Sequence, residues 1–333
     1  MFIPIVILLA GFAILIKGAD FLVDGASSAA RKYGISNLAI GLTVVAFGTS
    51  MPELIVSLIS ALGGKNDASF GNVLGSNNFN LLFILGMAGV IYPLVIHRNT
   101  VKYEVPMSLL AAILLYVLVN DNLLWGTPTV TDGTTVYQGV LSRVDSVILL
   151  VFFSGFLIYI YRTMRMAPDV SEGSSIKIYK TYISVGMAVL GLVMLIGGGK
   201  LVVDNAIIIA QAFGLSEKLI GLTILAAGTS LPELATSCVA AYRKNTDIAI
   251  GNIVGSNIFN IFFILGTTGL IHPIHYNSAL NFDLEVLFAA TILLMIFMFT
   301  LSSRKLDRWE AGLMLVAYVV YTVYLVSIDS VPA

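Results

Sequence analysis

The chain has 333 residues, of which 58% are hydrophobic and 11% charged, and its mean hydropathy is +0.94. This composition excludes a water-soluble globule and is typical of a polytopic membrane protein. The net charge of −1 gives no support to nucleic-acid binding, and a single cysteine, Cys238, excludes an internal disulfide.

A window of about 19 residues finds ten apolar stretches along the chain. Their centres lie near residues 12, 50, 82, 112, 154, 192, 230, 262, 292 and 318. We therefore predict an all-α polytopic membrane protein with ten transmembrane helices. A polar segment divides the stretches into two groups of five, so we expect a first five-helix repeat at 1–165, a short cytoplasmic linker at 166–181 and a second repeat at 182–333.

Lys and Arg are distributed unequally between the two sets of loops. Loops that follow odd-numbered stretches hold thirteen of them, whereas the opposite loops hold only Lys65, Arg143 and Lys218. Because cytoplasmic loops carry the excess of positive charge, both termini are expected outside the cytoplasm. The compact loops favour an integral protein of a prokaryotic plasma or inner membrane.

The sequence contains one unit twice. A shift of 180 residues without a gap aligns GLTVVAFGTSMPEL (41–54) with GLTILAAGTSLPEL (221–234), and ten of fourteen positions are identical. The same shift aligns GNVLGSNNFNLLFILG (71–86) with GNIVGSNIFNIFFILG (251–266), and eleven of sixteen are identical. Each unit contains five predicted spans, an odd number, so the second copy enters the membrane from the opposite face. We therefore predict two inverted repeats, as in many alternating-access transporters.

Glu53 and Glu233 place a carboxylate in the middle of an apolar segment, where an ionised group costs at least about 2 kcal/mol. Neither has a Lys or Arg nearby in sequence. The neighbouring glycine and proline weaken the helix, so we expect broken second and seventh helices with freed carbonyls that line a polar cavity. We expect the freed carbonyls to be those of Ala46 and Ala226, and the same turns add the hydroxyls of Thr49, Ser50, Thr229 and Ser230. Oxygen-only shells suit hard cations such as Ca²⁺ and Na⁺.

Two polar stripes follow the third and eighth predicted helices. Their members recur every four residues: Asn72, Ser76 and Asn80, and Asn252, Ser256 and Asn260. Such spacing places each trio on one helix face. We expect Ser76, Asn80, Ser256 and Asn260 to complete the cation shell. Asn77 and Asn257 fall off the stripes, and the pattern does not decide between a ligand and a link between helices.

Other polar residues receive a structural interpretation. Asp20, Asp24 and Asp204 lie toward helix ends, where Lys17 or Lys200 can pair with them. Ser50 and Ser230 have no His or Lys at a pairing position within the membrane, so the sequence does not predict an enzyme.

The paired GTS[ML]PE and GN[VI][LV]GSN[NI]FN motifs resemble the α-repeats of the sodium/calcium exchanger family, within the wider group of cation/calcium antiporters. The resemblance covers nearly the whole chain. It implies ten transmembrane helices with outside termini, and exchange of Na⁺ for Ca²⁺ without a cofactor or an obligatory protein partner. At the matching positions it implies the ion ligands Thr49, Ser50, Glu53, Ser76, Asn80, Thr229, Ser230, Glu233 and Ser256, and the carbonyls of Ala46 and Ala226.

Asn260 departs from the family pattern, because the best-understood exchangers carry an aspartate at this position. The predicted site therefore holds two carboxylates, which balance one Ca²⁺ or two Na⁺. We carry over the fold and the exchange reaction, and the number of Na⁺ per Ca²⁺ stays open.

Two other functions remain open from sequence. Glu53 or Glu233 can carry a proton as well as a metal, which allows a proton-coupled exchanger of Ca²⁺ or another cation. A cation channel would use the same oxygens for downhill flux, although an inverted repeat favours a carrier.

Overall fold

The computed structural model describes residues 2–120, 129–131, 134–136, 138–164, 177–213, 226–300 and 304–329. Eight helices in these ranges are long and apolar enough to cross a membrane, and a bent helix pair, Asn37–Thr49 with Met51–Leu62, makes a ninth span. The predicted all-α membrane fold is therefore confirmed. The first half of the predicted seventh span precedes Ala226 and lies outside the described residues, so the count of ten stays a prediction.

The elements follow one another in a similar order in the two halves, with short π-helical turns labelled η1, η2, η3 and η5. The first half contains α1 (Phe2–Tyr33), α2 (Asn37–Ile40), η1 (Gly41–Val45), α3 (Ala46–Thr49), α4 (Met51–Leu62), α5 (Asn66–Asn78), η2 (Phe79–Ile84), α6 (Leu85–Ile91), β1 (Leu94–Val95), η3 (Thr100–Glu104), α7 (Val105–Val119), β2 (Thr129–Thr131), β3 (Thr134–Val136), β4 (Gln138–Leu141) and α9 (Arg143–Thr163).

The second half contains α10 (Thr181–Ala212), α12 (Ala226–Gly228), α13 (Leu231–Tyr242), α14 (Thr246–Ile258), η5 (Phe259–Leu265), α15 (Gly266–Ile271), β5 (Ile274–Asn277), the 3₁₀ turn η6 (Ser278–Leu280), α16 (Asn281–Phe297), β6 (Lys305–Leu306) and α17 (Arg308–Asp329). The bounds of α13 and α14 equal those of α4 and α5 plus 180. The similarity found by the 180-residue shift therefore extends to helix ends.

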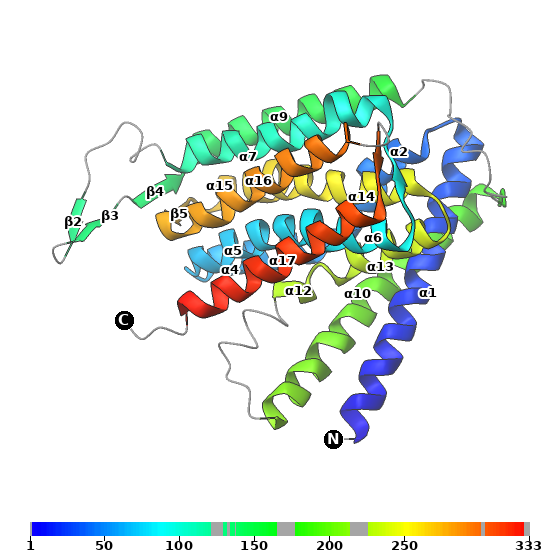
Figure 1. Ribbon diagram of the computed structural model, residues 1–333, viewed down its shortest axis with the longest axis horizontal. Helices are drawn as coiled ribbons and strands as arrows, with labels where there is room; N and C mark the ends of the chain where they lie inside the picture. The colour runs from blue at the N-terminus through cyan, green and yellow to red at the C-terminus, as the bar shows by residue number, and fades with distance from the viewer. Residues whose placement is uncertain are drawn as a thin grey trace.

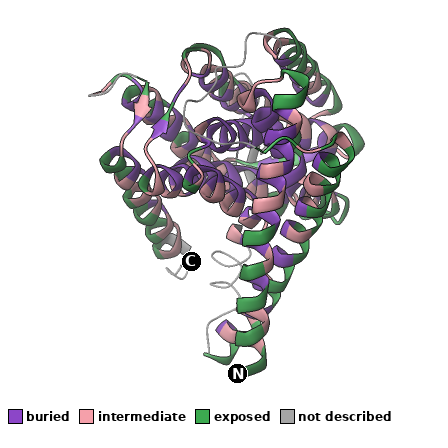
Figure 2. Ribbon diagram, turned by 90° about the vertical axis from the view of Figure 1, so that its right-hand side faces the viewer, coloured by how far each residue is buried: buried purple, intermediate pink, exposed green. Residues whose placement is uncertain are grey.

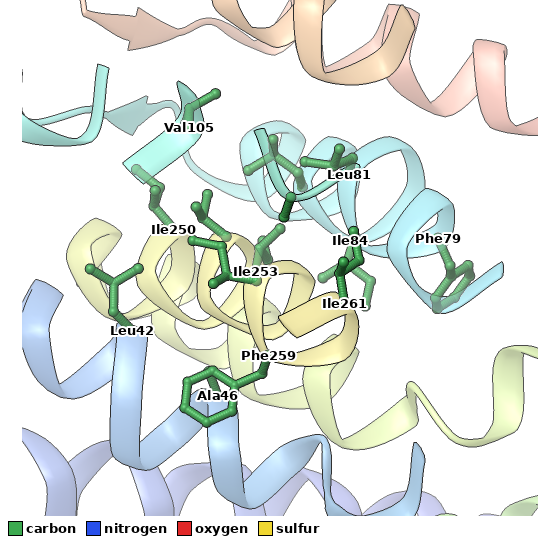
Figure 3. Packing of buried hydrophobic residues seen from close by; sticks show 14 of the residues in the cluster. Leu42, Ala46, Phe79, Leu81, Ile84, Val105, Ile250, Ile253, Phe259 and Ile261 are labelled. Carbon is green, nitrogen blue, oxygen red and sulfur yellow. The ribbon is translucent and has the colours of Figure 1, made fainter. Parts of the chain in front are cut away.

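Two central spans, Asn66–Ile91 and Thr246–Ile271, form the core of the bundle. In the span Thr246–Ile271, which contains α14, η5 and α15, 94% of the residues in the most apolar stretch are buried, against 22% in α1. Figure 2 shows this buried centre inside a shell of exposed residues. The span Thr246–Ile271 packs its apolar side chains among those of neighbouring helices, as Figure 3 shows for Ile250, Ile253, Phe259 and Ile261. The core thus contains the segments that carry the two stripes of Asn and Ser recurring every four residues.

The long helices α1 and α10 lie side by side and extend away from the other helices (Figure 1). Glycines allow their backbones to touch: a Cβ added at Gly18 would lie 2.9 Å from the Gly191 carbonyl oxygen, and one at Gly198 would lie 3.0 Å from the Gly11 carbonyl oxygen. Because the lower number on one helix meets the higher number on the other, α1 and α10 are antiparallel. Small residues permit such close packing inside membranes.

Short antiparallel strand pairs join loops from the two halves. Strand β1 pairs with β6, with Leu94 opposite Leu306, and strand β4 pairs with β5, with Leu141 opposite Ile274. Figure 1 shows β4 and β5 together at one end of the bundle. These pairs connect the segments that precede α7 and α9 with those around α16.

Candidate ion-binding site

The bent span places Glu53 in the first turn of a new helix. The bend is 45° and lies between α3 and α4, where Ser50 leaves helical geometry with φ −83° and ψ 6°. Ser230 has nearly the same backbone angles, φ −89° and ψ 8°, between α12 and α13. Pro52 and Pro232 follow in the first turn of α4 and α13, where proline is best tolerated because the first N–H groups of a helix have no partner within that helix. The predicted break of the second helix is therefore present, and α12 and α13 are separate at the corresponding position, although the preceding part of the seventh span lies outside the described residues. The dipoles of α4 and α13 favour negative charge on Glu53 and Glu233.

The expectation that the break frees the Ala46 carbonyl was wrong. This oxygen accepts the Ser50 N–H at 3.0 Å. Because Pro52 has no N–H, the carbonyl that loses its helical donor belongs to Gly48, four residues earlier. Ala226 is the first residue of α12.

The two carboxylates meet the serines of the opposite repeat. Ser230 Oγ donates to Glu53 Oε1 at 3.0 Å, and Ser50 Oγ donates to Glu233 Oε1 at 2.9 Å. Adding or subtracting 180 converts one bond into the other. All four side chains are buried, with at most 3% of any of them exposed. Ser76 Oγ approaches Glu53 Oε1 at 3.5 Å from α5. The structure therefore brings the predicted carboxylates into one buried cluster.

Asn72 and Asn252 link the broken helices of the two repeats. Thr49 Oγ1 donates to Asn252 Oδ1 at 3.1 Å, and the Asn252 amide group in turn donates to the Glu233 backbone carbonyl at 3.4 Å. Asn72 repeats both contacts, accepting from Thr229 at 3.3 Å and donating to the Glu53 carbonyl at 3.1 Å. These two asparagines were placed on the polar stripes but not in the predicted cation shell. Their role here is to hold the turns that carry the carboxylates.

Asn77 and Asn257 orient the remaining predicted ligands. The amide of Asn80 donates to Asn257 Oδ1, and that of Asn260 donates to Asn77 Oδ1, both at 3.0 Å. Each of Asn80 and Asn260 thus uses its nitrogen in the protein and keeps its side-chain oxygen available. The sequence pattern did not reveal this role of Asn77 and Asn257, because each bonds an asparagine of the other repeat.

Five buried oxygens of the cluster have no hydrogen-bond partner within the protein. They are Glu53 Oε2, Glu233 Oε2, Asn80 Oδ1, Asn260 Oδ1 and Ser256 Oγ. An unpaired buried acceptor costs about 1–3 kcal/mol, so this set calls for a positively charged ligand. Among the described residues, no Lys, Arg or His forms an ion pair with Glu53 or Glu233. In the same part of the chain, no three His, Cys, Asp or Glu side chains lie close enough together to hold a metal ion by themselves. Two carboxylates and neutral oxygens are a donor set for a hard cation.

The aspartates outside the cluster form ion pairs. Lys17 lies 3.5 Å from Asp20, and Lys200 lies 3.2 Å from Asp204, as the sequence led us to expect. The sequence did not reveal that Arg243, at the end of α13, bonds both Asp20 and Asp24 on α1.

Comparisons with known proteins agree with this geometry. The family model described as "Sodium/calcium exchanger protein" matches residues 3–162 and 183–327. The chain is 31% identical over 352 residues to the "Sodium/calcium exchanger MaX1" of Methanosarcina acetivorans, covering 96% of this chain and 97% of that protein. It is 36% identical over 284 residues to the "Inner membrane protein YrbG" of Escherichia coli, covering 82% and 81%.

A solved structure of the sodium-calcium exchanger NCX_Mj, soaked with Na⁺ and Ca²⁺, has the same fold. It superposes with a TM-score of 0.77 at 29% identity, covering 99% of each chain. The family model covers both halves that carry the carboxylate cluster. This integral membrane protein therefore belongs to the sodium/calcium exchanger protein family of cation antiporters.

Proposed function

We propose that the protein exchanges Na⁺ for Ca²⁺ across the membrane by alternating access at a midplane site. The observation that carries this proposal is the convergence of Glu53 and Glu233 in one cluster with five unpaired oxygens, two of which are their own. The names of MaX1 and NCX_Mj add support for the pair of ions.

The proposed ligands are the residues expected from sequence: Ala46, Thr49, Ser50, Glu53, Ser76, Asn80, Ala226, Thr229, Ser230, Glu233, Ser256 and Asn260. Their oxygens would replace the hydration shell of the ion, and the Ala46 carbonyl would use the lone pair that the Ser50 N–H leaves free. The hydroxyl hydrogens of Thr49 and Thr229 are donated to asparagines, so the oxygen lone pairs of these hydroxyls would bind the cation.

Competition between ions would couple the two fluxes. Two carboxylates neutralise one Ca²⁺ or two Na⁺, and either load lowers the cost of keeping both charges in a low-dielectric site. An empty site would leave two buried negative charges near one another, which disfavours reorientation without an ion. Exchange then follows, because one ion crosses only in return for another.

The proposed arrangement in the membrane follows the charge distribution. Repeats at 1–165 and 182–333 would flank a cytoplasmic linker at 166–181, with both termini outside and the protein in the plasma or inner membrane. The antiparallel packing of α1 against α10 fits repeats of opposite orientation.

Radioactive Ca²⁺ uptake into sodium-loaded proteoliposomes diluted into sodium-free buffer tests the proposal. Uptake should require internal Na⁺. It should fall by at least about tenfold in Glu53→Gln, because the site then loses one of the two carboxylates that bind the ion. Asp204→Asn is the matched control, since it makes the same chemical change at a half-exposed position of α10.

Equal uptake by Glu53→Gln and wild type would rule out the site. Uptake that ignores Na⁺ but follows a pH gradient would preserve the site and replace sodium by protons. Downhill Ca²⁺ flux with no counter-ion would identify a channel instead.

A further inference from the structure

A basic hollow lies at the end of the bundle where strands β1 and β6 pair. Its volume is about 470 Å³, and it is lined by Arg98, Val101, Lys102, Phe299 and Arg304. The first three residues belong to the segment between β1 and α7, and the other two follow α16. Loops from both halves of the chain therefore build one concave site.

The backbone holds Arg304 firmly in this hollow. Its φ of 64° is in the left-handed region, which a non-glycine residue adopts only at an energetic cost. Its N–H donates to the Met298 carbonyl at 2.7 Å, and its own carbonyl accepts the Ile96 N–H at 2.8 Å. These bonds and the β1–β6 pair compensate for the strained conformation and fix the backbone of Arg304, whose side chain lines the hollow together with Arg98 and Lys102.

The three cations of the hollow have no carboxylate partner among the residues that the structure describes. The acids of the neighbouring segments are engaged elsewhere. Asp307 pairs with Lys305 and Asp247 with His97, both at 2.8 Å, and Glu310 accepts the Asp307 N–H at 2.8 Å. Glu104 is buried and accepts the Tyr159 hydroxyl. Three like charges thus converge without compensation. Their natural complement is an anion with several oxygens, such as a phosphate group.

The position of the hollow favours a phosphate that is part of a lipid. The α7 span begins at Thr100 and the α16 span ends at Phe297, so the hollow lies at the membrane boundary. Phe299 is 68% exposed on its rim, and the Lys102 ammonium lies 5.1 Å from the ring of the exposed Tyr103. Aromatic side chains at this level meet lipid headgroups, and basic hollows between transmembrane helices bind anionic ones.

We propose that this hollow binds the headgroup of an anionic phospholipid, with its acyl chains along the exposed apolar faces of α7 and α16. The lipid would bridge a loop of the first half to a loop of the second half. It would stabilise the bundle without occupying the carboxylate cluster.

The test uses full-length, delipidated protein in dodecyl maltoside, titrated with dioleoyl phosphatidylglycerol. Bound lipid is counted by native mass spectrometry, and stability is followed by thermal unfolding. The triple variant Arg98→Gln, Lys102→Gln, Arg304→Gln should bind this lipid about tenfold more weakly or worse and lose the lipid-dependent rise in Tm. Arg31→Gln, Arg162→Gln, Lys177→Gln removes the same charge at exposed positions outside the hollow and should behave as wild type.

Three results would overturn the proposal. The first is equal retention of phosphatidylglycerol by the two triple variants, and the second is equal retention of dioleoyl phosphatidylcholine by the wild type. The third is an equal rise in Tm with inorganic phosphate alone, which would identify a small-anion site. If the triple variant does not fold, Arg98→Gln and Lys102→Gln are measured singly, since both side chains are exposed.

Discussion

Asn77 and Asn257 each donate a side-chain N–H to the backbone carbonyl of the other, and both distances are 3.3 Å. The two residues are 180 positions apart, so each is the counterpart of the other in the duplicated unit. Such reciprocal bonds are what the predicted inverted repeats would form where they meet at a two-fold axis. The same two side chains orient Asn80 and Asn260, so the reciprocal contact lies beside the proposed ion site.

Asn77→Ala should weaken Ca²⁺ binding, because Asn260 would lose the oxygen that fixes its amide. Loss of such an orienting partner typically lowers metal affinity about 10- to 100-fold. Calorimetric titration of the purified variant measures the change. Asn78→Ala is the control on the same helix, since Asn78 bonds Asp283 and Tyr321 instead. Equal loss of affinity in both variants would contradict the orienting role.

Asn260→Asp should make exchange sensitive to voltage. The substitution adds a third carboxylate next to Glu53 and Glu233, so a charge-balanced load would hold one more Na⁺. Ca²⁺ uptake is compared in proteoliposomes with the voltage clamped and then released. We expect little voltage dependence in the wild type and a clear dependence in the variant. A strong dependence already present in the wild type would refute the two-charge balance.

Arg243→Gln should destabilise the protein by about 1–2 kcal/mol, because two neighbouring carboxylates on α1 would lose their shared partner. Thermal unfolding in detergent measures this as a lower Tm. Lys200→Gln serves for comparison: its ion pair with Asp204 lies within α10, and both side chains are at least half exposed, so little stability should be lost. A similar Tm for the two variants would show that the α1–α13 link contributes nothing.

Gly191→Ala should loosen the packing of α10 on α1. A Cβ at this position would lie 2.6 Å from the Leu22 amide nitrogen and 2.7 Å from the Gly18 carbonyl oxygen, so the two backbones must separate. Gly197→Ala makes the same change on α10 where a Cβ would meet nothing within 4 Å. We expect a lower Tm for the first variant, and no loss for the second, because alanine favours helix over glycine by about 1 kcal/mol.

Sequence alone was sufficient for the membrane class and for the central carboxylates. A chain this apolar is stable only in a lipid bilayer. A Glu in an apolar segment that proline interrupts has few explanations besides a bound cation. The 180-residue shift predicted which residues would be equivalent, and the helix bounds and the Ser50–Glu233 and Ser230–Glu53 bonds follow that equivalence.

Only the tertiary structure decided which groups bond to which. Helical periodicity places Asn77 on a face but does not say that Asn257 lies opposite it, because that contact depends on how two helices cross. For the same reason the sequence did not reveal the link from Arg243 to α1, or the hollow formed by Arg98, Lys102 and Arg304. Residue chemistry and spacing determine what a segment can bind, whereas packing between distant segments determines what it meets.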